Sequence, residues 1–372
     1  MTRRREVLFA TITIVISLLG VSAIAEILLR FLPVANVPLI VPVTAADPVF
    51  HYTPNRPFLF SRDWDLHLVN HGRVNNAGMV NDQDYQKEDT TPLLAVVGDS
   101  YIEAMMVPYA ETLQGHLANA LYGRLRVYSY AASGAPLSQY IIWARHAVRE
   151  YGAKALIVNV VGNDFDESHD LYKVDFPGFW IYVRGPDGQL RLRLFEFPVR
   201  AVRSLVKHSA LARYLFINLH VKSLFSRSRT GDGGGQFQGD IGARRYAGNT
   251  AVEADTARVN ASVAVIDAFF RDLSDLVGLP PTRVLFIMDG FRYPDQAKQG
   301  VGTYFDRMRR AFRERAEARG YEVIDVDPLF FSDSSRHARR FEDSRDHHWN
   351  ATAHGIVANA VLRSKLLAQF PF

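Results

Sequence analysis

The chain has no cysteine among its 372 residues. Disulfide bonds, thiolate nucleophiles and cysteine-ligated zinc are therefore excluded. A basic stripe interleaved with aromatic residues is also lacking, because the formal net charge is only +4 and the lysines and arginines are spread along the chain, so nucleic acid is not an expected partner. His347 and His348 are adjacent, but no second histidine cluster with helical spacing accompanies them. The sequence predicts neither a metal nor a cofactor.

The longest apolar run lies at the N-terminus. Residues 7–25 are uncharged and mainly apolar, which is about the length that spans a bilayer, and arginines occupy positions 3–5. Positive charge on this side predicts a cytoplasmic N-terminus of residues 1–6 and an exported remainder beyond about residue 32. The small residues at 23–25 leave a cleavable signal peptide as the alternative. The apolar pattern continues past that point, so we predict a signal-anchor helix over residues 7–32 of a bacterial cytoplasmic membrane protein.

The rest of the chain predicts an α/β fold. Residues 33–92 are rich in proline, asparagine and aromatic residues, and we interpret them as a linker with a small irregular subdomain. From residue 93, short apolar runs alternate with helical periodicity. The predicted strands are 93–97, 125–130, 156–161, 284–288 and 323–326, and the predicted helices are 111–122, 137–151, 252–277, 304–319 and 352–370. This order is typical of a three-layer α/β/α sandwich with a mainly parallel, five-stranded, flavodoxin-like sheet in a domain spanning 93–372.

An insertion at about 165–250 interrupts this alternation. It begins with an aromatic cluster of Phe176, Phe179, Trp180 and Tyr182. A basic amphipathic stretch follows at 198–225, for which a solvated helical face is favoured over binding to anionic lipid or polysaccharide. Glycine, serine and arginine dominate about 226–250, which predicts a flexible loop.

Small polar motifs follow the first three predicted strands of the domain. Gly98, Asp99 and Ser100 come after the first strand, Ser133 and Gly134 after the second, and Gly162, Asn163 and Asp164 after the third. A serine at a strand-to-helix turn projects beside free backbone N–H groups, which suits a nucleophile. A glycine N–H and the asparagine amide can donate to an oxyanion. Each motif alone is also compatible with an ordinary turn or helix cap.

The base and its orienting carboxylate are predicted near the end of the chain. An acyl-transfer serine needs a general base, and that base needs a carboxylate at its other ring nitrogen. Asp346 and His348 are two residues apart, which places both on one side of an extended segment, whereas His347 points away. His116, His146 and His169 are interpreted as surface or packing residues.

Together these motifs resemble the SGNH (GDSL-type) hydrolase superfamily in its bacterial membrane-anchored form. The matching residues are Gly98-Asp99-Ser100 with Glu103, then Gly134, then Gly162-Asn163-Asp164, then Asp346 with His348. The resemblance implies Ser100 as nucleophile, an oxyanion hole of the Ser100 N–H, the Gly134 N–H and the Asn163 amide, and a triad completed by His348 and Asp346.

The aspartate of this pattern is displaced. Many family members carry it three residues before the histidine, where this chain has Arg345. Asp346-x-His348-Trp349-Asn350 instead resembles exported, alginate-type polysaccharide O-acetylation proteins. We therefore expect an esterase or O-acetyltransferase acting on acyl groups of envelope carbohydrate, with a membrane acyl-donor protein as partner if it is a transferase. A membrane-associated lipid esterase and a non-catalytic glycan-binding protein on the same fold are the alternatives.

Overall fold

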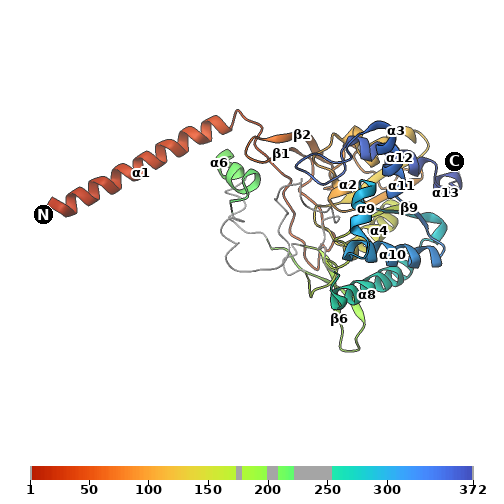
Figure 1. Ribbon diagram of the computed structural model, residues 1–372. Helices are drawn as coiled ribbons and strands as arrows, with labels where there is room; N and C mark the ends of the chain where they lie inside the picture. The colour runs from red at the N-terminus through yellow and green to blue at the C-terminus, as the bar shows by residue number, and fades with distance from the viewer. Residues whose placement is uncertain (1, 173–177, 199–207, 222–253, 371–372) are drawn as a thin grey trace. The chain divides into compact units, whose positions relative to one another are not determined.

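The computed structural model describes residues 2–172, 178–198, 208–221 and 254–370 (Figure 1). The chain forms two compact units. The first contains residues 1–38, 57–71 and 199–231, and the second contains residues 39–56, 72–198 and 232–372. The flexible loop predicted at 226–250 lies outside the described residues, and the domain boundaries proposed from the sequence stay a prediction.

The first unit is built around one long helix. Helix α1 (Thr2–Leu29) has no helix-breaking residue other than Gly20, and its 27-residue stretch Arg3–Leu29 has a mean hydropathy of 2.5 in its most apolar window, none of which is buried. By length and composition, this helix is able to span a membrane or serve as a signal sequence. The unit also holds most of the β1 (Arg56–Arg62) and β2 (His67–Val74) hairpin, helix α6 (Ala210–Arg213) and the π-helical turn η2 (Tyr214–Asn218).

The second unit contains a five-stranded parallel sheet in the order β4-β3-β5-β8-β9. Its strands are β3 (Leu93–Gly98), β4 (Arg126–Ala131), β5 (Ala153–Val160), β8 (Val284–Met288) and β9 (Glu322–Asp325). All residues of β3 and β8 are buried, as expected for strands covered on both faces. The predicted fold class is confirmed, because this strand order is that of a doubly wound, flavodoxin-like sheet.

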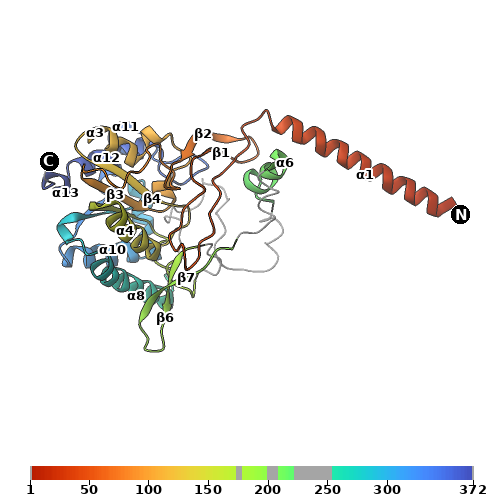
Figure 2. The same ribbon diagram turned by 180° about the vertical axis from the view of Figure 1, so that it is seen from behind.

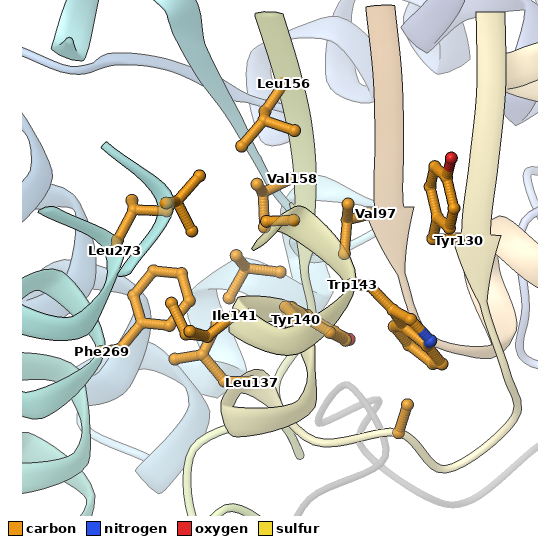
Figure 3. Close-up of a cluster of buried hydrophobic side chains, with 14 of the residues drawn as sticks. Val97, Tyr130, Leu137, Tyr140, Ile141, Trp143, Leu156, Val158, Phe269 and Leu273 are labelled. Atoms are coloured by element: carbon orange, nitrogen blue, oxygen red, sulfur yellow. The ribbon is translucent and has the colours of Figure 1, made fainter. Parts of the chain in front are cut away.

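Helices cover both faces of the sheet (Figures 1 and 2). Alternate residues of β3 serve the two layers: Ala95 and Val97 pack into one core, and Leu94 and Val96 into the other. The first core is closed by α4 (Leu137–Tyr151), α8 (Thr256–Asp272) and α10 (Tyr304–Ala318). Figure 3 shows side chains from β3, β5, α4 and α8 meeting there. The second core is closed by α2 (Ser100–Glu103), α3 (Leu113–Ala120), α11 (Asp327–His337), α12 (Ala351–Leu362) and α13 (Lys365–Ala368).

Several elements differ from the sequence predictions. The predicted helix 352–370 is divided into α12 and α13, because the Ser364 hydroxyl accepts from the Leu367 N–H and starts a new helix. Helix α8 ends in the π-helical turn η3 (Leu273–Val277). Helix α9 (Pro294–Gly300), helix α11, the antiparallel hairpin of β6 (Trp180–Arg184) and β7 (Leu190–Leu194), and the short turns η1 (Tyr109–Glu111) and η4 (Pro281–Arg283) were not predicted.

The aromatic cluster predicted in the insertion lies largely in the core. Phe179 and Tyr182 are buried, Trp180 is half-buried, and Phe176 lies outside the described residues. Of the predicted basic stretch, only 198 and 208–221 are described. Among the histidines set aside from catalysis, the ring of His146 packs against Tyr151, and His169 is buried.

Candidate active site

Three predicted motifs follow three neighbouring strands of the sheet. Strand β3 lies between β4 and β5, and all three are parallel, so their carboxyl ends meet at one edge. Ser100 follows the end of β3, Gly134 the end of β4, and Asn163 the end of β5. The topology therefore gathers these residues at the edge where ligands bind in open α/β sheets.

Ser100 is the first residue of the short helix α2, in a turn that its neighbours define closely. The Asp99 carboxylate caps this helix by accepting from the Tyr101 N–H at 2.9 Å. Gly98 is required by close approach, because a Cβ atom there would lie 2.4 Å from Cγ1 of Ile102. Ser100 is 9% exposed, so little of this residue is accessible to solvent.

Ser100, His348 and Asp346 form one hydrogen-bonded chain. The Nε2 atom of His348 lies 2.7 Å from Oγ of Ser100, and its Nδ1 atom hydrogen-bonds to Oδ1 of Asp346. The same carboxylate oxygen accepts from the His348 backbone N–H at 2.9 Å, and the aspartate is only 1% exposed. This arrangement can remove the serine proton through the imidazole while the carboxylate fixes the ring and balances its charge.

Asp99 is a second acceptor for the serine hydroxyl. Its Oδ2 atom lies 3.2 Å from Oγ of Ser100, which is longer than the distance to the imidazole. Burial raises the pKa of the Asp99 carboxyl to about 6, and the hydrogen bond from the Tyr101 N–H and the charge of His348 oppose this rise.

Asp99→Asn is expected to stabilise the fold at pH 7 and to have a much smaller effect at pH 4. A raised pKa means that the folded state disfavours the charged carboxylate. The resulting loss of folding free energy is complete above the folded-state pKa of about 6, and it disappears below the ordinary value of 3.8, where the carboxyl is protonated in both states. Two pKa units correspond to about 3 kcal/mol, and asparagine keeps the capping oxygen. Urea unfolding of both proteins at the two pH values measures this difference. An equal effect at both would contradict it.

The turn after β5 is fixed by Asp164. Its carboxylate accepts from the Val161 N–H at 2.8 Å and from the Tyr140 hydroxyl at 2.9 Å. Burial holds the pKa of this carboxyl well above its ordinary value. Gly162 is buried within the turn, and Oδ1 of Asn163 is buried with no hydrogen-bond partner among the described residues. The turn after β4 contains Gly134 with a φ of +74°, which favours glycine.

A buried ion pair that contacts the residues following Ser100 and His348 was not predicted from the sequence. Asp289 and Arg292 are both fully buried, with Oδ1 and Nη1 2.6 Å apart. The same aspartate oxygen accepts from Nε1 of Trp349 at 3.0 Å, and Nη2 of Arg292 donates to the Tyr101 hydroxyl at 3.1 Å. That hydroxyl donates to the His347 carbonyl at 3.2 Å. The network therefore joins the turn after β8 to the helix of the nucleophile and to the loop of the base.

Arg292→Ala is expected to lower the free energy of unfolding by about 3 to 5 kcal/mol, because it leaves the Asp289 carboxylate buried without its charged partner. The matched control is Arg310→Ala, which breaks an exposed ion pair with Asp306 and is expected to cost less than about 1 kcal/mol. Denaturant unfolding of the two variants gives both values. Equal losses would show that the buried pair is not a major source of stability.

The predicted site residues lie as follows. Ser100, His348 and Asp346 are brought into contact, Gly98, Asp99, Gly162 and Asp164 shape the turns, and Gly134 and Asn163 lie at the same sheet edge. Their catalytic and oxyanion-binding roles stay predictions. Within the described ranges, no group of three or more histidine, aspartate or glutamate residues is arranged to hold a metal ion.

Comparison with solved structures finds similar proteins of low sequence identity. No family model and no curated protein matches the sequence. An acetyl xylan esterase, AlAXEase, is 10% identical over 75% of this chain and 100% of its own, with a TM-score of 0.41. A member of the lipolytic protein G-D-S-L family from Veillonella parvula is 10% identical over 75% and 97%, with a TM-score of 0.38. A lipase/acylhydrolase from Enterococcus faecalis is 8% identical over 76% and 98%, with a TM-score of 0.39.

Proposed function

We propose that this chain is a serine-dependent ester hydrolase or acyltransferase of the SGNH type. The observation that carries the proposal is the hydrogen-bonded chain from Oγ of Ser100 through His348 to Asp346. It is supported by the position of Ser100 at the carboxyl edge of a parallel sheet, beside the turns that contain Gly134 and Asn163. A complete triad argues against a non-catalytic binding protein.

The mechanism has two acyl-transfer steps. Nε2 of His348 accepts the Ser100 proton as Oγ forms a bond to the ester carbonyl carbon. The negative charge on the carbonyl oxygen is stabilised by the Ser100 N–H, the Gly134 N–H and the Asn163 amide. The alcohol leaves with the proton from His348, and an acyl-serine remains. Water then attacks in an esterase, or a sugar hydroxyl in a transferase, and its proton returns through His348 to Ser100.

The proposed substrate is an O-acyl group, most simply acetyl, on envelope carbohydrate. Support comes from Asp346-x-His348-Trp349-Asn350, which resembles the O-acetylation proteins. A lipid substrate is less well supported, because Phe179 and Tyr182, which would have placed acyl chains near the site, are buried in the core. In the transferase alternative, a membrane acyl-donor protein supplies the acyl group.

We further propose that the chain is anchored in the bacterial cytoplasmic membrane by α1, with its N-terminus inside and the catalytic unit outside. The length and hydropathy of α1 and the arginines at its amino end support this orientation. A substrate outside the membrane is consistent with it.

The test is hydrolysis of 4-nitrophenyl acetate, butyrate and octanoate by the full chain in detergent. Turnover that Ser100→Ala removes supports the proposed chemistry, and preference for acetate over octanoate supports the acetyl substrate. Preference for octanoate would favour the lipid alternative. A folded protein that neither turns over any ester nor is labelled at Ser100 by a fluorophosphonate would contradict the assignment of the nucleophile.

A further inference from the structure

A segment far along the chain is attached to the carboxyl-terminal end of α1. The Glu26 carboxylate, in the last turn of that helix, accepts from the Ser209 hydroxyl at 2.8 Å, the Ala210 N–H at 3.1 Å and the Leu211 N–H at 2.8 Å. Figures 1 and 2 both show α6 beside this end of α1. These bonds, together with Arg30 Nε, which donates to the same carboxylate at 2.8 Å, satisfy an acidic group that would otherwise be costly next to a membrane-spanning stretch.

Two more sets of hydrogen bonds join this segment to the β1–β2 hairpin and to the residues after α1. The buried side chain of Asn218 accepts from the Ala35 N–H at 3.2 Å and donates to the Ser61 hydroxyl at 3.0 Å. The Tyr214 hydroxyl donates to the Trp64 carbonyl at 2.7 Å. Residues 26–36, 61–64 and 209–218 therefore form one small body at the end of α1, which we call the collar.

Large apolar side chains of the collar are exposed. Phe31 is 83% exposed, Trp64 71%, Leu32 51% and Phe216 40%. Aromatic side chains with a polar edge, tryptophan above all, are enriched where hydrocarbon meets headgroups. The apolar surface of α1, which is exposed along its length, reaches the collar directly at Phe31. The bilayer that would surround α1 is thus the surface nearest to these side chains.

We propose that the collar is a membrane-interface module, in which Trp64, Phe31 and Phe216 enter the outer headgroup boundary of the bilayer that α1 spans. This proposal goes beyond the proposed ester chemistry, and it rests on the proposed anchoring of the chain in the membrane by α1. The hydrogen bonds that Glu26 accepts, and those made by Asn218, hold the collar against the end of the span, so that its depth is set by α1.

Tryptophan fluorescence tests the collar. The full chain is reconstituted into phosphatidylcholine–phosphatidylglycerol vesicles with ordinary or brominated acyl chains, and vesicle flotation checks anchoring. Trp143 and Trp349 are fully buried, and Trp180 is half-buried with its Nε1 donating to the Pro48 carbonyl at 2.8 Å. Trp64, which is 71% exposed, is therefore the tryptophan expected to give most of the quenching by bromine. Trp64→Phe should abolish most of the quenching, whereas the control Trp143→Phe should retain it.

The outcomes separate the collar from the other proposals. If the protein floats with the vesicles but its fluorescence is quenched equally with and without Trp64, the proposal for the collar is overturned and the proposed membrane anchor stands. A chain that does not float overturns both. Exposed aromatic residues that dock on another protein instead would give flotation without quenching. Ser100-dependent ester hydrolysis, measured on the same samples, reports on the catalytic proposal independently.

A second inference concerns Glu103, which ends the helix that begins at Ser100. Its buried carboxylate accepts from the Tyr52 hydroxyl at 2.5 Å, from the Ser133 N–H at 2.9 Å and from the Ser133 hydroxyl. Ser133 immediately precedes Gly134, whose N–H is a proposed oxyanion donor. One carboxylate thus connects the helix of the nucleophile to the turn of the donor.

We infer that Glu103 is a positioning residue, which holds the Gly134 N–H at a fixed place relative to Ser100. The inference rests on the proposed function. Glu103→Leu removes both carboxylate oxygens and therefore the bonds from Ser133. In Glu103→Gln the amide oxygen can still accept from Ser133 while the NH₂ donates to the Tyr52 hydroxyl oxygen, so this variant is the conservative control. A small displacement of an oxyanion donor can cost about 100-fold in rate.

The test is steady-state hydrolysis of 4-nitrophenyl acetate together with thermal unfolding. For Glu103→Leu we expect kcat to fall by about 100-fold with little change in KM, because the donor acts mainly in the transition state, and Glu103→Gln should recover much of this loss. Tyr52→Phe, which keeps both Ser133 bonds, should lose much less. A kcat unchanged in Glu103→Leu overturns the positioning role while Ser100-dependent turnover stands. Absence of Ser100-dependent turnover in the parent protein overturns both.

Discussion

Ser100→Ala is expected to lower kcat for ester hydrolysis by about 10⁶-fold while the protein stays folded. The magnitude follows from serine hydrolases of other folds, in which removal of the nucleophile leaves only the catalysis that binding and the oxyanion hole provide. The hydroxyl of Ser100 contacts Nε2 of His348 and Oδ2 of Asp99, and neither contact is a large source of stability. The fold should therefore tolerate the change.

His348→Ala should cause a loss of similar size, and the double variant should lose little more. This non-additivity is expected because the serine and the imidazole act as one unit in the same proton transfer. The measurement is turnover of 4-nitrophenyl acetate, with circular dichroism to confirm folding. Ser335→Ala, at an exposed serine on α11, is the matched control and should keep full activity. Substantial activity in Ser100→Ala would show that another residue is the nucleophile.

The features that sequence reasoning could predict are those with a local cause. Strands β3 and β8 are continuous apolar runs, because both of their faces are covered by helices, and such runs are visible without the structure. Parallel pairing then brings the ends of β3, β4 and β5 together, which is why three motifs far apart in the chain could be assigned to one edge.

The features that were missed depend on tertiary contacts. Arg292 is a charged residue between two aromatic residues, and only its complete burial against Asp289 reveals its importance. The sequence did contain a signal for this site. Asp289 and Gly290 directly follow the apolar run of β8, just as the three predicted motifs directly follow the apolar runs of their own strands. Tyr52 offers no such signal, because it lies in a stretch interpreted as a linker and meets Glu103 only in the folded chain.

Helix α11 was missed for a different reason. Its sequence DPLFFSDSSRH is rich in serine and aspartate, which favour caps and turns over helix interiors. Phe330 is its only fully buried residue, so no apolar period could be seen. Its aromatic packing against Phe341, with ring centroids 4.6 Å apart, supplies stability that propensity does not.

Asp346→Asn is expected to lower kcat by about 10⁴-fold with little change in the fold. Oδ1 of Asp346 contacts both Nδ1 and the backbone N–H of His348, so this carboxylate fixes the ring with its proton on Nδ1. Nε2 is then free to accept from Ser100. An asparagine amide can present a donor to Nδ1, which stabilises the opposite tautomer and blocks acceptance at Nε2; the same substitution in another serine hydrolase has a loss of this order.

The control for Asp346→Asn is Asp343→Asn, which neutralises a carboxylate of the same loop whose Oδ1 accepts from the Arg345 N–H at 2.8 Å. It should retain nearly full kcat, since it does not alter the imidazole tautomer. Labelling by a fluorophosphonate gives a second readout, because reaction at Ser100 also requires its proton to pass to His348. A small effect of Asp346→Asn on both readouts, or an equal effect of Asp343→Asn, would mean that loop charge and not the His348 tautomer controls the rate. A large effect confined to Asp346→Asn would support the orienting role of this residue, even though many members of the resembled family carry the aspartate one position earlier.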